Sequence, residues 1–332
     1  MRAGVTPLVE VEDLHVHFGA ARAVDGASVR VLPGEVLALV GESGSGKTTL
    51  IRAIQGLQKP TSGVIRVDGT GGSSPGHVQN IFNPTVQMVF QDPTGALNPR
   101  QTIYEIVAEG LRIKRNAGSE TEQVAAALSR AGLRPPERFF PLYPHEVSGG
   151  QRQRVVIAGA MVMEPRLLLA DEPVASLDAS IRGEILALMR RLVDETGLAI
   201  LVVTHDLGLA WNIADRVAVM YLGRIVETGP TEQILENPRH PYTRALLSVV
   251  PETREMEQQI LTGEIPDPAR IPAGCRFHPR CPLLQSGDLP EAISSRCPID
   301  DPGPTPLEAI SAAACWAVTS GVDSAAIGFN PG

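Results

Sequence analysis

Three short runs of the chain are apolar at every position, at residues 36–40, 167–170 and 199–203. A strand of this kind is buried on both faces, which is typical of a parallel sheet that is covered on both sides. Between the second and third runs, apolar residues recur at helical spacing, at Ile181, Ile185, Leu188, Met189 and Leu192. This pattern predicts a β-α-β unit within a parallel sheet.

Other hydrophobic patterns surround this unit. Residues 102–164 carry apolar residues at helical spacing, and prolines between residues 135 and 144 divide that region into shorter helices. Residues 216–221 and 224–228 predict a closing hairpin. Short strand patterns are found at residues 8–11, 14–18, 27–31, 64–67 and 86–90.

The first apolar run leads into a glycine-rich loop that opens a helix. The loop has the spacing of a phosphate-binding loop, and Leu50, Ile54 and Leu57 follow on one helical face. Glycines let backbone N–H groups point at phosphate oxygens, Lys47 adds a charge for the β- and γ-phosphates, and the Thr48 hydroxyl can ligate Mg²⁺. The predicted nucleotide contacts in this loop are Gly41, Ser43, Gly44, Ser45, Gly46, Lys47, Thr48 and Thr49.

Polar and charged residues end the other two apolar runs. Asp171 and Glu172 follow one run, and His205 follows the other. Because ligands bind at the carboxyl ends of parallel strands, these side chains are expected beside the phosphate-binding loop. A second segment, residues 148–151, places Ser-Gly-Gly before an apolar helix. This segment could bind a phosphate, or it could be only a helix cap and turn.

Composition narrows the classes of function. A net charge of −8 argues against a chain built to coat nucleic acid. The longest apolar runs, such as residues 155–163, are far shorter than the ~20 residues of a membrane span. The N-terminus has no apolar signal region, so a cytoplasmic protein is expected. Aromatic residues make up only 4% of the chain, and one of them, Phe18, could either stack on an adenine or pack in the core.

Taken in order, these motifs resemble those of the ATP-binding-cassette (ABC) family, over residues 7–240. Residues 41–48 resemble the Walker A loop, residues 148–151 the family signature and residues 168–171 the Walker B strand. The single residues that match are Gln91 of the Q-loop, Glu172 after Walker B, Asp178 at the end of the D-loop and the switch histidine His205.

The resemblance implies an α/β fold. The expected architecture is an ABC nucleotide-binding domain with a RecA-like parallel-sheet core, an antiparallel β subdomain and a helical subdomain at about residues 95–164. Residues 1–240 are expected to form the ATP-binding domain. Residues 241–332 are expected to form a small, loop-rich C-terminal domain.

The resemblance also implies a mechanism of ATP hydrolysis. Asp171, Thr48 and Gln91 would hold Mg²⁺, while Glu172 acts as the general base and His205 contacts the γ-phosphate side. Two cassettes would stack head to tail, and the signature of one chain would close over the ATP of the other. The further nucleotide contacts expected on this basis are Phe18, Ser148, Gly149, Gly150, Gln151 and Asp178.

Residues 237–247 and 272–282 resemble the C-terminal signature of peptide-permease ATPase subunits. This resemblance implies an ATPase that energises import of oligopeptides or dipeptides and lies peripherally on the cytoplasmic face of the cell membrane. The expected partners are a second ABC ATPase subunit (a sister chain or a copy), two transmembrane permease subunits and an extracytoplasmic peptide-binding protein, with no nucleic acid. The alternatives are an importer of nickel or glutathione, and a soluble ABC ATPase in DNA repair or translation.

All four cysteines fall in a proline-rich C-terminal region, at Cys275, Cys281, Cys297 and Cys315. Disulfides are disfavoured in a cytoplasmic chain, and free structural thiols are one possibility. A zinc site is another, although no C-x₂-C pair occurs. The family resemblance implies a third, a [4Fe-4S] cluster held by the four thiolates, and this cluster is the expectation carried forward.

Overall fold

The computed structural model describes residues 6–69, 84–114, 118–250, 261–308 and 311–320. Its largest element is an eight-stranded sheet with the strand order β10-β11-β9-β8-β3-β7-β6-β5. The strands of this sheet are β3 (Val36–Val40), β5 (Val86–Val89), β6 (Leu167–Asp171), β7 (Ala199–Thr204), β8 (Arg216–Tyr221), β9 (Arg224–Pro230), β10 (Thr305–Glu308) and β11 (Ser311–Ala313).

The strands from β8 to β5 form the parallel half of this sheet, and β9, β11 and β10 are added antiparallel. A second sheet is antiparallel, with the order β2-β1-β4. It consists of β1 (Val9–Phe18), β2 (Ala21–Val31) and β4 (Ser62–Val67). The two strand patterns predicted at residues 8–11 and 14–18 are thus one strand, in which register shifts absorb the break in the pattern.

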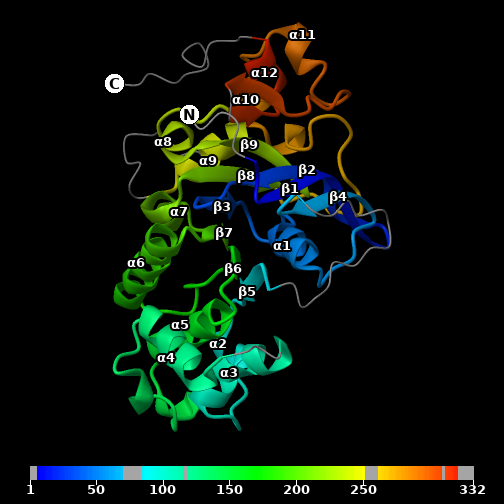
Figure 1. The fold of residues 1–332 in the computed structure, drawn as a ribbon. Helices are drawn as coiled ribbons and strands as arrows, with labels where there is room; N and C mark the ends of the chain where they lie inside the picture. The colour runs from blue at the N-terminus through cyan, green and yellow to red at the C-terminus, as the bar shows by residue number, and fades with distance from the viewer. Residues whose placement is uncertain (1–5, 70–83, 115–117, 251–260, 309–310, 321–332) are drawn as a thin grey trace.

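Period-2 alternation explains how the parallel strands are buried on both faces. In β3, Leu37 and Leu39 pack against α1 (Lys47–Gln55) and the antiparallel sheet. Val36, Ala38 and Val40 face the opposite layer. Figure 1 shows α1 and the antiparallel sheet on one side of the large sheet and the second layer of helices on the other. That second layer contains α6 (Ala179–Thr196), α7 (Leu207–Ile213), α8 (Thr231–Glu236) and α9 (Pro241–Leu247).

A separate hydrophobic core lies among the helices that precede β6. Figure 1 shows these helices as a lobe apart from the three-stranded sheet and α1. The lobe contains α2 (Pro93–Ala96), α3 (Ile103–Lys114), α4 (Glu120–Arg130), η1 (Pro136–Arg138), η2 (Pro144–Glu146) and α5 (Gly149–Met161). The α/β fold class is therefore confirmed, while the exact domain limits at residues 240 and 95–164 stay a prediction.

The C-terminal region is joined to the preceding part of the chain at several points. Strand β11 pairs with β9, and Phe277 packs among Tyr221 and Tyr242. The predicted loop-rich character fits the described part, whose helical segments are short. These segments are η4 (His278–Arg280), α10 (Pro282–Ser286), α11 (Glu291–Ser294) and α12 (Trp316–Thr319). Within the described ranges, no helix has the length and apolarity needed to cross a membrane.

Candidate nucleotide site

The loop between β3 and α1 has a backbone that only glycine can follow. Gly41, Gly44 and Gly46 have φ angles of 149°, 79° and 105°. A Cβ atom on Gly41 would lie 2.1 Å from the carbonyl oxygen of Met220, and one on Gly46 would lie 2.1 Å from that of Ala23. The glycine spacing seen in the sequence is therefore required by backbone sterics.

The loop presents positive charge and free N–H groups together. The Lys47 ammonium donates to the carbonyl oxygens of Gly41 and Glu42 at 2.7 and 2.8 Å, and to Ser45 Oγ at 3.3 Å. The N-terminus of α1 follows Gly46 and has no side-chain cap, so its first N–H groups point out at a positive helix end. This arrangement fits the phosphates of a nucleotide.

Hard oxygen ligands lie next to this helix end. The Thr48 hydroxyl donates to Asp171 Oδ1 at 3.1 Å, although the two residues are far apart in the sequence. Burial raises the pKa of Asp171, while the Thr48 hydrogen bond and nearby cations lower it. A hydroxyl and a buried carboxylate oxygen are the ligand types that Mg²⁺ takes beside nucleotide phosphates, so these two residues fit that ion.

Glu172 is held between two predicted site residues at neighbouring strand ends. His205 Nδ1 lies 2.9 Å from Glu172 Oε1, and Gln91 Nε2 donates to Glu172 Oε2 at 3.0 Å. Glu172 has a φ angle of 45°, in the left-handed region that a non-glycine residue adopts at a cost of about 1–3 kcal/mol. Its N–H donates to the Val203 carbonyl at 2.9 Å, which ties this strained residue to β7.

The signature segment forms a helix cap in this chain. Ser148 Oγ accepts from the Gln151 N–H at 3.2 Å, and Gln151 Oε1 accepts from the Ser148 N–H at 3.0 Å. Gly149 and Gly150 begin α5, which lies in the helical lobe, apart from α1 (Figure 1). The structure therefore does not bring residues 148–151 to the phosphate-binding loop of the same chain.

The remaining predicted nucleotide contacts lie at the surface. Phe18 ends β1 and is 52% exposed, which excludes core packing and leaves its ring open for stacking. Asp178 is the N-cap residue of α6 and makes no side-chain capping bond. Ser43 and Gly44 are exposed on the loop, and Thr49 lies in the first turn of α1.

Sequence reasoning missed the contacts that the C-terminal region makes with the phosphate-binding loop. The Arg280 guanidinium donates to both carboxylate oxygens of Glu42, at 2.8 and 3.1 Å. The Glu42 N–H donates to Tyr242 Oη at 2.9 Å. Glu42 is an unspecified position of the loop motif, so the loop sequence does not predict these contacts. The only signal in the sequence is that Tyr242 and Arg280 lie in the motifs at residues 237–247 and 272–282.

The four cysteines line one pocket in the C-terminal region, together with Phe277 and Trp316. All four are free. Burial raises the pKa of the Cys275 and Cys281 thiols to about 12, so that these groups are neutral near pH 7.

Two family models match the chain. One, described as ABC transporter, matches residues 24–175. The other, described as the C-terminal region of oligopeptide/dipeptide transporters, matches residues 226–287.

Curated relatives match most of the chain. The oligopeptide transport ATP-binding protein OppF of Escherichia coli (strain K12) is 43% identical, and the match covers 83% of this chain and 89% of the relative. The dipeptide transport ATP-binding protein DppF of Haemophilus influenzae is 44% identical, and that match covers 78% of this chain and 81% of the relative.

Solved structures agree with the fold. The cbiO1 structure from Clostridium perfringens, part of the ABC transporter complex cbiONQ, has a TM-score of 0.63 and 31% identity. The match covers 70% of this chain and 91% of the cbiO1 chain. The dimeric structure of MJ0796, a bacterial ABC transporter cassette, has a TM-score of 0.60 and 29% identity, and covers 67% of this chain and 98% of its own.

The prediction of a [4Fe-4S] cluster at Cys275, Cys281, Cys297 and Cys315 is wrong. The relatives are plain peptide-transport ATP-binding proteins, and nothing in these matches supports a cluster. Among the described residues, the group whose ligand atoms are close enough to share a metal ion contains no cysteine. The same findings give no support to zinc at these cysteines.

The two family matches agree with the geometry of the site. One covers the phosphate-binding loop and the Asp171–Glu172 strand end, and the other covers the C-terminal region. The chain belongs to the ATP-binding-cassette family of ABC transporters, among the oligopeptide and dipeptide transport ATP-binding proteins.

Proposed function

We propose that this chain is the ATP-hydrolysing subunit of an importer of oligopeptides or dipeptides. The observation that carries the catalytic part is the Glu172 carboxylate, held between His205 and Gln91 at the strand ends where the phosphate-binding loop begins. The peptide part rests on the C-terminal region match at residues 226–287 and on relatives named for oligopeptide and dipeptide transport.

In the proposed site, the first-turn N–H groups of α1 and the Lys47 ammonium bind the β- and γ-phosphates of ATP. Thr48 and Asp171, with Gln91, would hold Mg²⁺, which neutralises phosphate charge when bound. The Phe18 ring would stack on the adenine, since it is exposed. Side-chain position supports the roles of Lys47, Thr48 and Asp171, and exposure supports that of Phe18.

Glu172 is the proposed general base. A carboxylate accepts a proton from water that attacks the γ-phosphate, and a base must lie within hydrogen-bond reach of that water. Without nucleotide, Gln91 and His205 each contact one Glu172 oxygen. A water molecule bound with the nucleotide would replace one of these contacts. His205 would then turn to the γ-phosphate side, which its 61% exposed ring permits.

The site is proposed to be completed by a second cassette. Residues 148–151 lie in the helical lobe, so their N-terminal helix end is free to reach a nucleotide on another chain. A related cassette whose structure is titled dimeric supports this arrangement. Two transmembrane permease subunits and an extracytoplasmic peptide-binding protein are the further partners, and the chain would lie peripherally on the cytoplasmic face of the membrane.

The soluble alternatives in DNA repair or translation are not favoured, because the C-terminal match is specific to peptide transporters. An importer of nickel or glutathione is likewise not favoured, because the relatives are named for oligopeptide and dipeptide transport. Measuring peptide-, nickel- and glutathione-stimulated ATP hydrolysis in the complete complex, with its binding protein, would separate them. Stimulation by nickel or glutathione but not by peptides would overturn the peptide assignment.

Replacing Glu172 with Gln tests the proposed base. The amide keeps the size of the side chain but accepts no proton, so we expect a loss of at least ~100-fold in ATP hydrolysis by the assembled complex. ATP binding should be retained. Glu122→Gln, at an exposed site in α4, is the matched control and should leave the rate unchanged. Wild-type hydrolysis by the Glu172→Gln complex would contradict the assignment.

A further inference from the structure

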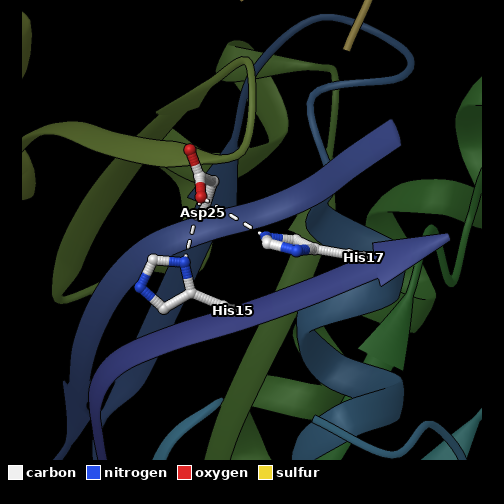
Figure 2. A group of neighbouring side chains, drawn as sticks. All are labelled: His15, His17 and Asp25. Carbon is white, nitrogen blue, oxygen red and sulfur yellow. Dashed lines mark hydrogen bonds and ion pairs between the residues drawn. The ribbon is translucent and has the colours of Figure 1, made fainter. Parts of the chain in front are cut away.

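Two histidines and an aspartate meet on the antiparallel sheet, outside the nucleotide site. His15 and His17 are two residues apart on β1, so both side chains project from the same face. Asp25 lies on β2, directly opposite His15 in the antiparallel register. Figure 2 shows both rings turned toward the carboxylate.

Potential ligand atoms converge in this cluster. His15 Nδ1 lies 2.9 Å and His17 Nε2 lies 3.4 Å from Asp25 Oδ1. One ligand atom from each of the three residues lies within 4.8 Å of the others. His17 Nε2 is buried and has no hydrogen-bond partner, although it points at this carboxylate. An imidazole nitrogen that makes no hydrogen bond and has only this 3.4 Å ion-pair contact can serve as a ligand for a cation.

The cluster has the outer contacts that orient metal ligands. His15 Nε2 lies 3.2 Å from Asp13 Oδ1, so the ring can donate outward through Nε2 when an ion is bound. Nδ1, which faces Asp25 Oδ1 at 2.9 Å without an ion, then becomes the ligand atom. Asp25 Oδ2 accepts from Arg276 Nη2 at 2.5 Å, which leaves Oδ1 facing the histidines.

We propose that His15, His17 and Asp25 bind one divalent transition-metal ion of the zinc class. Two imidazoles and one carboxylate suit Zn²⁺, Co²⁺ and Ni²⁺, whereas Mg²⁺ and Ca²⁺ prefer oxygen ligands. Three protein ligands leave a fourth position for water. Two arginines next to Asp25 repel a cation. Arg276 Nη2 lies 2.5 Å from Asp25 Oδ2, and Arg22 Nη1 lies 3.8 Å from the same oxygen. The expected affinity is therefore moderate rather than that of a closed structural site.

The location gives the ion a structural consequence. The Asp25 N–H donates to the Gly223 carbonyl at 2.9 Å, and Arg276 Nη1 donates to the Leu222 carbonyl at 2.7 Å. Asp25 thus joins β2, the turn between β8 and β9, and the C-terminal region. An ion bound to Asp25 stabilises this junction and should raise the melting temperature by mass action.

Calorimetric titration of the metal-free, full-length chain with Zn²⁺ tests the proposal. We expect one ion per chain, and at least ~10-fold weaker binding in His17→Gln, because one of three ligands is lost. His17→Gln is the decisive variant, since His17 makes no hydrogen bond through Nε2 and its removal spares the Asp25–Arg276 pair. His145→Gln, at an exposed histidine in the helical lobe, is the matched control and should bind as the wild type does.

X-ray absorption of the zinc-loaded chain identifies the ligands independently. Nitrogen and oxygen at about 2.0–2.2 Å support the site, whereas sulfur at about 2.3 Å places the ion elsewhere and overturns the proposal. Unchanged zinc affinity in His17→Gln also overturns it and leaves only an ion-pair network. ATP binding by His17→Gln should be retained, so this test fails or succeeds separately from the proposed ATPase function.

Discussion

At the scale of single residues, backbone geometry sets the strictest limits. The phosphate-binding loop needs Gly41 and Gly46 because a Cβ atom at either position would collide with a backbone carbonyl. The sequence motif alone states the spacing of these residues. The collisions explain why the strands that pack against the loop, and not only the nucleotide, require glycine there.

Gly46→Ala should destabilise the protein and weaken ATP binding. Its Cβ would lie 2.1 Å from the Ala23 carbonyl at a φ of 105°, so both sterics and backbone strain oppose it, by more than ~1 kcal/mol. Urea denaturation and nucleotide titration measure the two effects. Gly159→Ala is the matched control, since nothing lies within 4 Å of that Cβ in α5, and there alanine should stabilise by about 0.5–1 kcal/mol. Equal stability of the two variants would contradict this account.

At the scale of elements, the N-cap residue of α9 is the buried histidine His240. His240 Nδ1 accepts from the Tyr242 N–H at 3.1 Å, and Glu227 Oε2 accepts from the His240 N–H at 2.9 Å. Burial lowers the pKa of His240 to about 3. The neutral ring is thus part of the folded state, and this helix cap depends on pH.

The sign of that dependence follows from linkage. Below about pH 6.5 the unfolded chain binds a proton at His240 that the folded chain refuses, so stability falls as pH falls toward 3. From pH 7 to pH 5 this residue alone should lower the free energy of unfolding by about 2 kcal/mol. His240→Asn keeps a capping oxygen without the titration, so urea denaturation of this variant should lose less stability over that interval. An identical loss in both proteins would exclude His240 as the cause.

The clamp between η4 and the phosphate-binding loop also belongs to this scale. Arg280 holds both carboxylate oxygens of Glu42, and the loop carbonyl of Glu42 in turn binds Lys47. Arg280→Met should therefore loosen the loop and raise the KM for ATP several-fold, with a smaller effect on kcat.

Three comparisons test the clamp. Glu42→Gln should have a similar effect, and the double variant should be little worse than either single one, because both remove the same contact. Arg270→Met, at an exposed arginine of the C-terminal region, should leave KM unchanged. Additive effects of the two single substitutions would argue against the clamp.

At the scale of the whole molecule, the chain divides its proposed nucleotide contacts between two surfaces. The loop and strand-end residues lie together, while residues 148–151 lie in the helical lobe. In the proposed function, this separation is the physical reason why a second chain would complete each site.

Gly149→Asp tests that division. The residue begins α5 and its Cβ has room, so the variant should fold, and an acidic residue there suits the helix N-terminus. Its charge would repel the phosphates bound by the partner chain. We expect ATP hydrolysis by the assembled complex to fall at least ~10-fold while the isolated variant binds ATP normally. Full hydrolysis by the complex, or loss of ATP binding by the isolated chain, would contradict the two-chain site.

Local patterns predicted much of the molecule. The apolar runs at β3, β6 and β7 require burial on both faces, and the phosphate-binding loop has a fixed spacing, so both could be read from neighbouring residues. The expectation that Leu57 lies on one helical face with Leu50 and Ile54 was wrong, because the helix ends at Gln55 and Leu57, which follows it, is 45% exposed. Helical periodicity does not show where a helix stops.

The sequence by itself determined the α/β class, the nucleotide-binding loop and the order of the charged strand ends, because each of them can be recognised from a pattern of neighbouring residues. Only the tertiary structure decided which distant side chains meet. It joined Arg280 to Glu42 and His15 and His17 to Asp25, and it enclosed the four cysteines in one pocket. Such contacts depend on how the C-terminal region and the strands pack, which spacing along the chain does not encode.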